Sequence, residues 1–219
     1  MAIGNGIGSV ICNTAMIMAL SIIFMPIEVD RKDFAPKGIL LIASVVALFL
    51  LSMNGSMNMI GAAVLLLIFI IFMIENVHSA RNHPSDDSEE KVKPEKNEII
   101  KNVVLIILGA ACIVIGSNLL VNYGTEIARA LGVSEAIIAV TMVAIGTSLP
   151  ELVTAITSII KKQSDMSVGN VVGANVIDVT LILAICSLVY RGNLPVSNTN
   201  IYLDFPVSIL VSVIAVVPT

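Results

Sequence analysis

Long apolar runs follow one another along this chain, and several approach or exceed the roughly 20 residues that a helix needs to cross a bilayer. Only 13% of the residues are charged and 57% are hydrophobic, a composition that excludes an ordinary soluble domain. We therefore predict an all-α integral membrane protein. The second run is short for a complete span, so we expect it to extend into its polar flanks. The predicted runs cover about residues 3–25, 38–51, 57–74, 99–121, 136–160, 168–189 and 201–219.

A polar motif, Gly-Thr-Ser-Leu-Pro-Glu at residues 146–151, interrupts the fifth apolar run. Pro150 has no N–H and crowds the carbonyl one turn earlier, so we expect the helix to kink or open there. Thr147 and Ser148 precede Glu151 by four and three residues, which lets all three side chains share one face. Such oxygen ligands beside a broken helix suit a hard cation such as sodium or calcium. A kink whose glutamate only hydrogen-bonds a neighbouring helix is the disfavoured alternative, because intramembrane carboxylates are costly.

The charged residues indicate how the chain crosses the membrane. A mixed-charge stretch without an apolar face, residues 77–97, is predicted to be a flexible linker, and His78 and His83 within it are interpreted as solvated side chains. If the seven runs are spans, ten of the 12 Lys and Arg residues fall on one side, and only Arg129 and Arg191 fall on the other. Because basic residues favour the cytoplasmic side, this predicts a multi-pass protein of the cell membrane with a cytoplasmic linker.

A ten-residue segment near the start of the chain recurs later. Residues 4–13 match residues 169–178 at a constant offset of 165, and both copies open an apolar helix with a Gly-xxx-Gly pair. Each copy places an amide or an acid, Asn13 or Asp178, five residues after its second glycine. These helices are the first and sixth predicted spans, so they run in opposite directions. The pattern predicts an inverted-topology repeat with a substrate site near the membrane midplane.

The repeat also predicts how the chain is divided. The same offset places the partner of the Gly146 motif before Met1, so we expect this chain to be a fragment that lacks the opening helices of its first repeat. We assign residues 1–76 to the remainder of the first repeat (three helices), 77–97 to the cytoplasmic linker, and 98–219 to a second repeat of four helices without its last helix. Close packing against a neighbouring helix at the centre is expected of Gly4, Gly8, Gly169 and Gly173.

These motifs resemble those of a known family. The motif at residues 146–152, followed by Gly-Asn-x-x-Gly at 169–173, looks like the second alpha repeat of the cation/calcium exchangers, and specifically of the prokaryotic-type sodium/calcium antiporters. Residues 1–20 look like the second half of the first alpha repeat. In that family ten helices form two inverted sets of five, and four central helices surround the cation sites. The resemblance therefore implies an inverted-topology repeat transporter fold, with about seven of the ten helices in this chain.

The resemblance also implies which residues hold the cation. Glu151 and Asp178 would be the acidic ligands. The neutral oxygen ligands would be the hydroxyl groups of Ser9, Thr147 and Ser148, the amide of Asn13 and the backbone carbonyl of Ala144. Two departures from the family pattern stand out: Ala174 replaces the usual serine, which removes one hydroxyl, and the first-repeat glutamate is absent.

The implied function is secondary antiport of calcium against sodium by alternating access, not enzymatic catalysis. It requires no cofactor beyond the transported ions, and its partners would be the lipid bilayer and the missing N-terminal helices, not nucleic acid. Coupling to protons or potassium stays open because Asp178 adds a titratable group where many relatives carry asparagine. A non-functional fragment of such a transporter also stays open. An intramembrane hydrolase is disfavoured because neither histidine lies in a predicted span.

Overall fold

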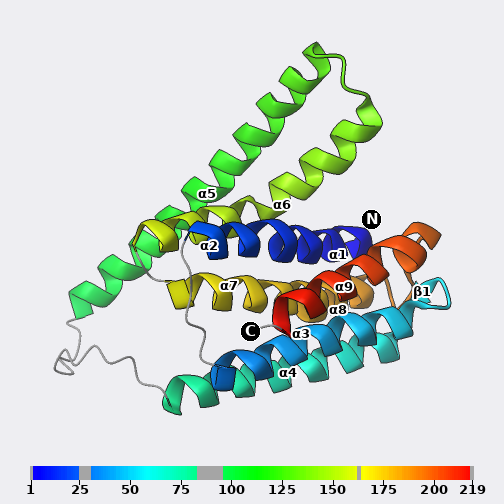
Figure 1. Ribbon diagram of the computed structural model, residues 1–219, viewed down its shortest axis with the longest axis horizontal. Coiled ribbons are helices and arrows are strands. Elements are labelled where there is room, and N and C mark those ends of the chain that lie inside the picture. The colour runs from blue at the N-terminus through cyan, green and yellow to red at the C-terminus, as the bar shows by residue number, and fades with distance from the viewer. Residues whose placement is uncertain (1, 25–30, 83–95, 162–163, 218–219) are drawn as a thin grey trace. The chain divides into compact units, whose positions relative to one another are not determined.

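The computed structural model describes residues 2–24, 31–82, 96–161 and 164–217 (Figure 1). Within these residues the chain forms seven continuous helical stretches, which correspond to the seven predicted spans. In chain order the elements are α1 (Ala2–Cys12), η1 (Asn13–Met18), α2 (Ala19–Phe24), α3 (Arg31–Ser52), β1 (Ser56–Met57), α4 (Met59–Asn82), α5 (Lys96–Ala130), α6 (Glu135–Ile160), α7 (Ser164–Ile177), η2 (Asp178–Ile182), α8 (Leu183–Val189), β2 (Leu194–Pro195), η3 (Asn200–Asp204) and α9 (Phe205–Val216).

Several of these helices are long and apolar enough to cross a membrane. Among the described residues five such spans are found, and a shorter apolar helix covers Asn200–Val216. Helix α3 begins at Arg31, which confirms that the second apolar run extends into its polar flank. The five candidate spans are Ala2–Phe24, Phe34–Ser52, Met59–Ser79, Glu98–Ala130 and Gly169–Val189.

The predicted linker is shorter than its polar composition indicates. Helix α4 continues to Asn82 and α5 begins at Lys96, so both helices extend into residues 77–97. Helix α4 continues past the apolar run because backbone hydrogen bonds between residues four apart do not depend on side-chain polarity. Asn76 adds a 2.9 Å bond from its Nδ2 to the Phe72 carbonyl. The rest of the predicted linker, residues 83–95, lies outside the described residues.

The chain divides into two compact units. One unit contains Met1–Val77 and Glu151–Thr219, and the other contains His78–Pro150. In the first unit the α1–η1–α2 stretch packs against the α7–η2–α8 stretch, and Figure 1 shows that the two run in opposite directions. Helix α3 packs against α7 and α9. The second unit contains α5 and the first part of α6.

The core of the first unit follows from helical spacing of apolar residues. Side chains three or four positions apart lie on one face of a helix, and here those faces pack against each other. The buried side chains include Ile3, Ile7 and Val10 on α1, and Val172, Val176 and Val179 on α7 and η2.

In the second unit, glycine ends the long helix α5. Gly132 has a φ of +78°, a left-handed conformation that a side chain disfavours. The Gly132 N–H bonds the Arg129 carbonyl at 2.9 Å, and the Val133 N–H bonds the Ala128 carbonyl at 3.0 Å. This pair of bonds satisfies helix-end carbonyls that would otherwise lack a donor.

Departures from regular α-helix occur at places that the sequence did not indicate. Segments η1 and η2 are π-helical and begin at Asn13 and Asp178, the two positions that the repeat pairs. In contrast, Pro150 lies inside α6, and the helix continues through it. Of the two outcomes predicted there, a kink or an opening, the opening is not found. The ring removes one hydrogen bond to the Gly146 carbonyl, and the turns on either side remain helical.

A short sheet adds an element that the all-α prediction did not include. Strands β1 and β2 pair antiparallel, with Ser56 opposite Pro195 and Met57 opposite Leu194. The Val196 N–H extends the pairing with a 3.0 Å bond to the Gly55 carbonyl. The sheet ties the loop after α3 to the loop before η3, at one end of the first unit.

Candidate functional site

Three polar side chains form a buried hydrogen-bonded chain between the two repeated helices. Asn13 Nδ2 donates a 2.9 Å bond to Asn175 Oδ1, and Asn175 Nδ2 donates a 2.9 Å bond to Thr14 Oγ1. Asn13 and Asn175 are both 0% exposed. Asn13 and Thr14 open the π-helical segment η1, and Asn175 lies on α7, one turn before Asp178. The two inverted copies of the repeat are therefore joined by side-chain amides.

Some oxygen atoms of the predicted ligands are buried without a hydrogen-bond donor. They are Oδ1 of Asn13, Oε2 of Glu151 and Oγ of Ser148. A buried carbonyl or carboxylate oxygen without a donor costs about 1–3 kcal/mol, so such atoms are rare unless something else satisfies them. Oxygen atoms of this kind are the ligands that sodium and calcium prefer.

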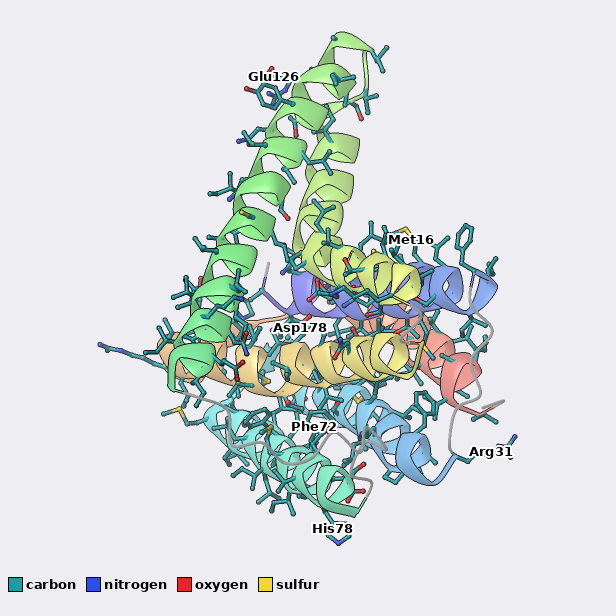
Figure 2. All side chains as sticks on the ribbon, turned by 90° about the vertical axis from the view of Figure 1, so that its left-hand side faces the viewer. Met16, Arg31, Phe72, His78, Glu126 and Asp178 are labelled. Atoms are coloured by element: carbon teal, nitrogen blue, oxygen red, sulfur yellow. The ribbon has the colours of Figure 1, made fainter. Side chains whose placement is uncertain are left out.

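The two predicted acidic ligands lie close enough to influence each other. Asp178 interacts electrostatically with Glu151, and both belong to the first compact unit. Glu151 lies on α6. Asp178 is the first residue of η2, which packs against α1, and it is labelled in Figure 2. The basic residues that follow them in sequence, Lys161 and Arg191, lie at the ends of their helices. Two carboxylates of like charge in an apolar bundle favour a site that takes up positive charge.

Within the described residues, no other acidic or metal-binding side chain enlarges this pair. Among the residues that the structure describes, no group of three or more His, Cys, Asp and Glu side chains could hold a metal ion. A cation at Glu151 and Asp178 would therefore complete its shell with neutral oxygen atoms from the protein or from water.

The other predicted ligands are placed as follows. Ser9 is buried on α1, one turn before Asn13, so it lies on the repeated helix as expected. Ser148 is buried, Thr147 is exposed, and Ala144 lies on the same helix, α6, in the part that belongs to the second unit. Ser9, Asn13, Asp178 and Glu151 all belong to the first unit.

The predicted contact with a neighbouring helix is confirmed at two of the four glycines. A Cβ atom on Gly4 would lie 2.9 Å from Asn200 Nδ2, and one on Gly173 would lie 3.8 Å from the Phe72 ring (labelled in Figure 2). At Gly8 and Gly169 no described atom lies within 4 Å of such a Cβ. Helical residues four apart differ by about 40° in direction, so the two members of a pair need not meet the same neighbour.

Comparison with known proteins identifies the family. The sequence pattern of the family described as "Sodium/calcium exchanger protein" matches residues 1–76 and 101–219. The chain belongs to this family. The unmatched residues between these ranges overlap the predicted linker.

Individual relatives agree with this assignment. An uncharacterized membrane protein of Methanocaldococcus jannaschii is 33% identical over 215 residues, which cover 98% of this chain and 68% of that protein. A sodium/calcium exchanger of Methanosarcina acetivorans is 43% identical over 90 residues, which cover 41% of this chain and 26% of that protein. The exchanger chain described here thus spans about two thirds of the first relative's length.

A solved structure of the same kind confirms the fold. The sodium-calcium exchanger NCX_Mj, soaked with sodium and strontium, superimposes with a TM-score of 0.75 at 31% identity. The match covers 98% of this chain and 68% of that chain. The exchanger described here therefore has the inverted-topology repeat transporter fold of a multi-pass membrane protein, and its named relatives are exchangers rather than enzymes.

One polar residue of the candidate site, Asn175, is not marked by the repeat. Asn175 stands opposite Val10 when the two repeats are aligned, because 175 less the offset of 165 is 10. The repeat therefore pairs this polar residue with an apolar one. Its position three residues before Asp178, on the same helical face, was the available signal.

Proposed function

We propose that this exchanger is a secondary antiporter that moves calcium against sodium and binds both ions at Glu151 and Asp178. The observation that carries the proposal is the pairing of two interacting carboxylates with buried oxygen atoms that lack donors, Glu151 Oε2 and Asn13 Oδ1. Carboxylates that only stabilised the helix bundle would be expected to accept hydrogen bonds or pair with a basic side chain. A cation satisfies the charge and the oxygen atoms together.

We assign the ligands by chemical type. Glu151 and Asp178 supply charge, and the amide oxygen of Asn13 supplies a neutral ligand. The family resemblance adds, as further candidate neutral ligands, the hydroxyl groups of Ser9, Thr147 and Ser148 and the carbonyl of Ala144. Calcium takes six to eight oxygen ligands, so this set accommodates calcium once water completes the shell.

Charge balance accounts for the coupling of the two ions. Two carboxylates carry two negative charges, which one calcium ion or two sodium ions neutralise. Both loads together would leave excess positive charge inside the hydrocarbon, which is unfavourable. Calcium and sodium therefore exclude each other at the shared ligands. Movement of outer helices against the inverted core would expose the site to one side of the membrane at a time.

The placement in the membrane is part of the same proposal. The distribution of Lys and Arg supports a cytoplasmic position for residues 77–97, and we propose that the exchanger lies in the cell membrane. The linker would then join residues 1–76 of the first repeat to residues 98–219 of the second. The transported ions are the only ligands that the proposal requires.

Transport by reconstituted protein tests the function. We expect radioactive calcium to enter proteoliposomes when an outward sodium gradient is imposed at equal pH on both sides. Glu151→Gln should abolish this uptake. Glu126→Gln is the matched control, because it removes the same charge from an exposed position on α5 (labelled in Figure 2) and should leave uptake unchanged.

The same vesicles distinguish the alternatives. Uptake that follows a potassium or proton gradient, and not a sodium gradient, would show a different coupling ion at the same site. Absence of calcium uptake under all three gradients, from protein that is folded by thermal unfolding, would refute antiport by this chain.

A further inference from the structure

We infer that Asn175 is a positioning residue that orients the amide of Asn13 so that its oxygen faces the transported cation. The inference rests on the proposed function, because it assumes that Asn13 Oδ1 is a cation ligand. It adds a residue that does not touch the ion but determines which atom of Asn13 does.

The geometry of the hydrogen bonds carries the first step. An amide group presents an oxygen on one side and an NH₂ group on the other. The NH₂ group of Asn13 is held by Asn175 Oδ1 at 2.9 Å, so Asn13 Oδ1 is directed away from Asn175. That oxygen is buried and has no donor. If Asn13 alone turned its amide, two amide oxygens would meet, and its NH₂ group would take the place of the ligand oxygen.

Thr14 completes the arrangement. Asn175 Nδ2 donates to Thr14 Oγ1 at 2.9 Å, so the orientation of Asn175 is itself constrained from the opposite helix. Asn175 is 0% exposed and Thr14 is 5% exposed, so water offers little competition for these bonds. Both polar groups of Asn175 are thus engaged within the protein, which is expected of a residue that acts through another.

The repeat shows that this device is one-sided. The equivalent of Asn175 in the first repeat is Val10, which is 0% exposed and apolar. At the position equivalent to Asn175, helix α1 therefore offers no amide that could orient Asp178 in return. A carboxylate presents two equivalent oxygen atoms and needs no such orientation, whereas the amide of Asn13 does. The asymmetry between Val10 and Asn175 matches the asymmetry between Asp178 and Asn13.

A double-mutant cycle on the purified protein tests the inference. We expect Asn175→Leu to weaken calcium binding about tenfold, the lower end of what loss of an orienting partner costs a metal site. In an Asn13→Ala background the same change should have little further effect, because no ligand remains to be oriented. Calcium affinity is measured by isothermal titration calorimetry, and thermal unfolding without calcium is recorded for each variant. A purely structural role would lower the unfolding temperature and the affinity equally in both backgrounds.

The outcomes separate this inference from the proposed function. The inference would be overturned if Asn175→Leu left calcium affinity unchanged, or if it lowered the affinity by the same factor with and without Asn13. Either result would leave the proposed cation binding intact. No calcium binding by the unaltered protein would instead overturn the proposed function, and the inference with it. If Asn175→Leu does not fold, Thr14→Val and Thr14→Ser decide. Thr14→Val should weaken calcium binding only where Asn13 is present, and Thr14→Ser should not weaken it. If both variants bind calcium with the same affinity as the unaltered protein, the positioning role is refuted.

Discussion

Replacement of one charge at the site should weaken calcium binding more than removal of one neutral ligand. Asp178→Asn keeps the size of the side chain and removes its charge, whereas Asn13→Ala removes an amide oxygen. Asp178 interacts with Glu151, and Asn13 Oδ1 is buried without a donor. If both residues contact the cation, the two variants report the value of a charged and of a neutral ligand in the same protein.

The expected magnitudes differ clearly. Removing one member of a buried charge interaction costs about 2–5 kcal/mol. Since about 1.4 kcal/mol is a factor of ten, Asp178→Asn should weaken calcium binding at least about 30-fold. Relief of the repulsion with Glu151 in the empty site acts in the same direction, because it stabilises the protein before calcium binds. Loss of a neutral interaction costs about 0.5–1.5 kcal/mol, so Asn13→Ala should weaken binding by about tenfold or less.

The assay is calorimetric titration of calcium into each purified variant at constant sodium concentration and pH. Thermal unfolding without calcium serves as the control for correct folding. Equal and small losses in the two variants would refute the reasoning. They would show that Asp178 and Asn13 are helix-packing polar residues, and that the cation site lies elsewhere.

Two further predictions concern packing and topology. Gly173→Leu should lower the unfolding temperature, because overpacking against Phe72 costs about 1–3 kcal/mol. Gly173→Ala should leave it unchanged, since a Cβ atom there lies at an ordinary 3.8 Å from Phe72. Equal unfolding temperatures of the two variants would contradict this prediction. Asn193 and Arg31 are both exposed and are predicted to lie on opposite sides of the membrane. In a variant without native cysteines, a membrane-impermeant maleimide should therefore label Asn193→Cys in intact cells. It should label Arg31→Cys only after permeabilisation. Labelling in the reverse pattern would invert the proposed topology.

The spans and the fold class could be read from the sequence because the bilayer imposes a local requirement. An uninterrupted apolar run of sufficient length must be helical, whatever its neighbours are. The extension of α3 to Arg31 followed from the same length requirement. The repeat was equally accessible, since matching residues 4–13 to 169–178 needs no knowledge of contacts.

The candidate acidic ligands could also be identified from local sequence. Glu151 and Asp178 stand out because a carboxylate within an apolar run is costly wherever it occurs. The helix boundaries were less accessible. The polar residues after Ile74 predicted a linker, but hydrogen bonds along the chain carried α4 on to Asn82.

Only the tertiary structure decided which polar groups meet. The hydrogen bond between Asn13 and Asn175 joins residues 162 positions apart in the chain. It depends on how the two helices are rotated about their axes. The same holds for the sheet that pairs Met57 with Leu194. The π-helical turns at Asn13 and Asp178 likewise have no marker such as proline in the sequence. Composition and spacing describe one helix at a time, whereas these features arise from the packing of one helix against another.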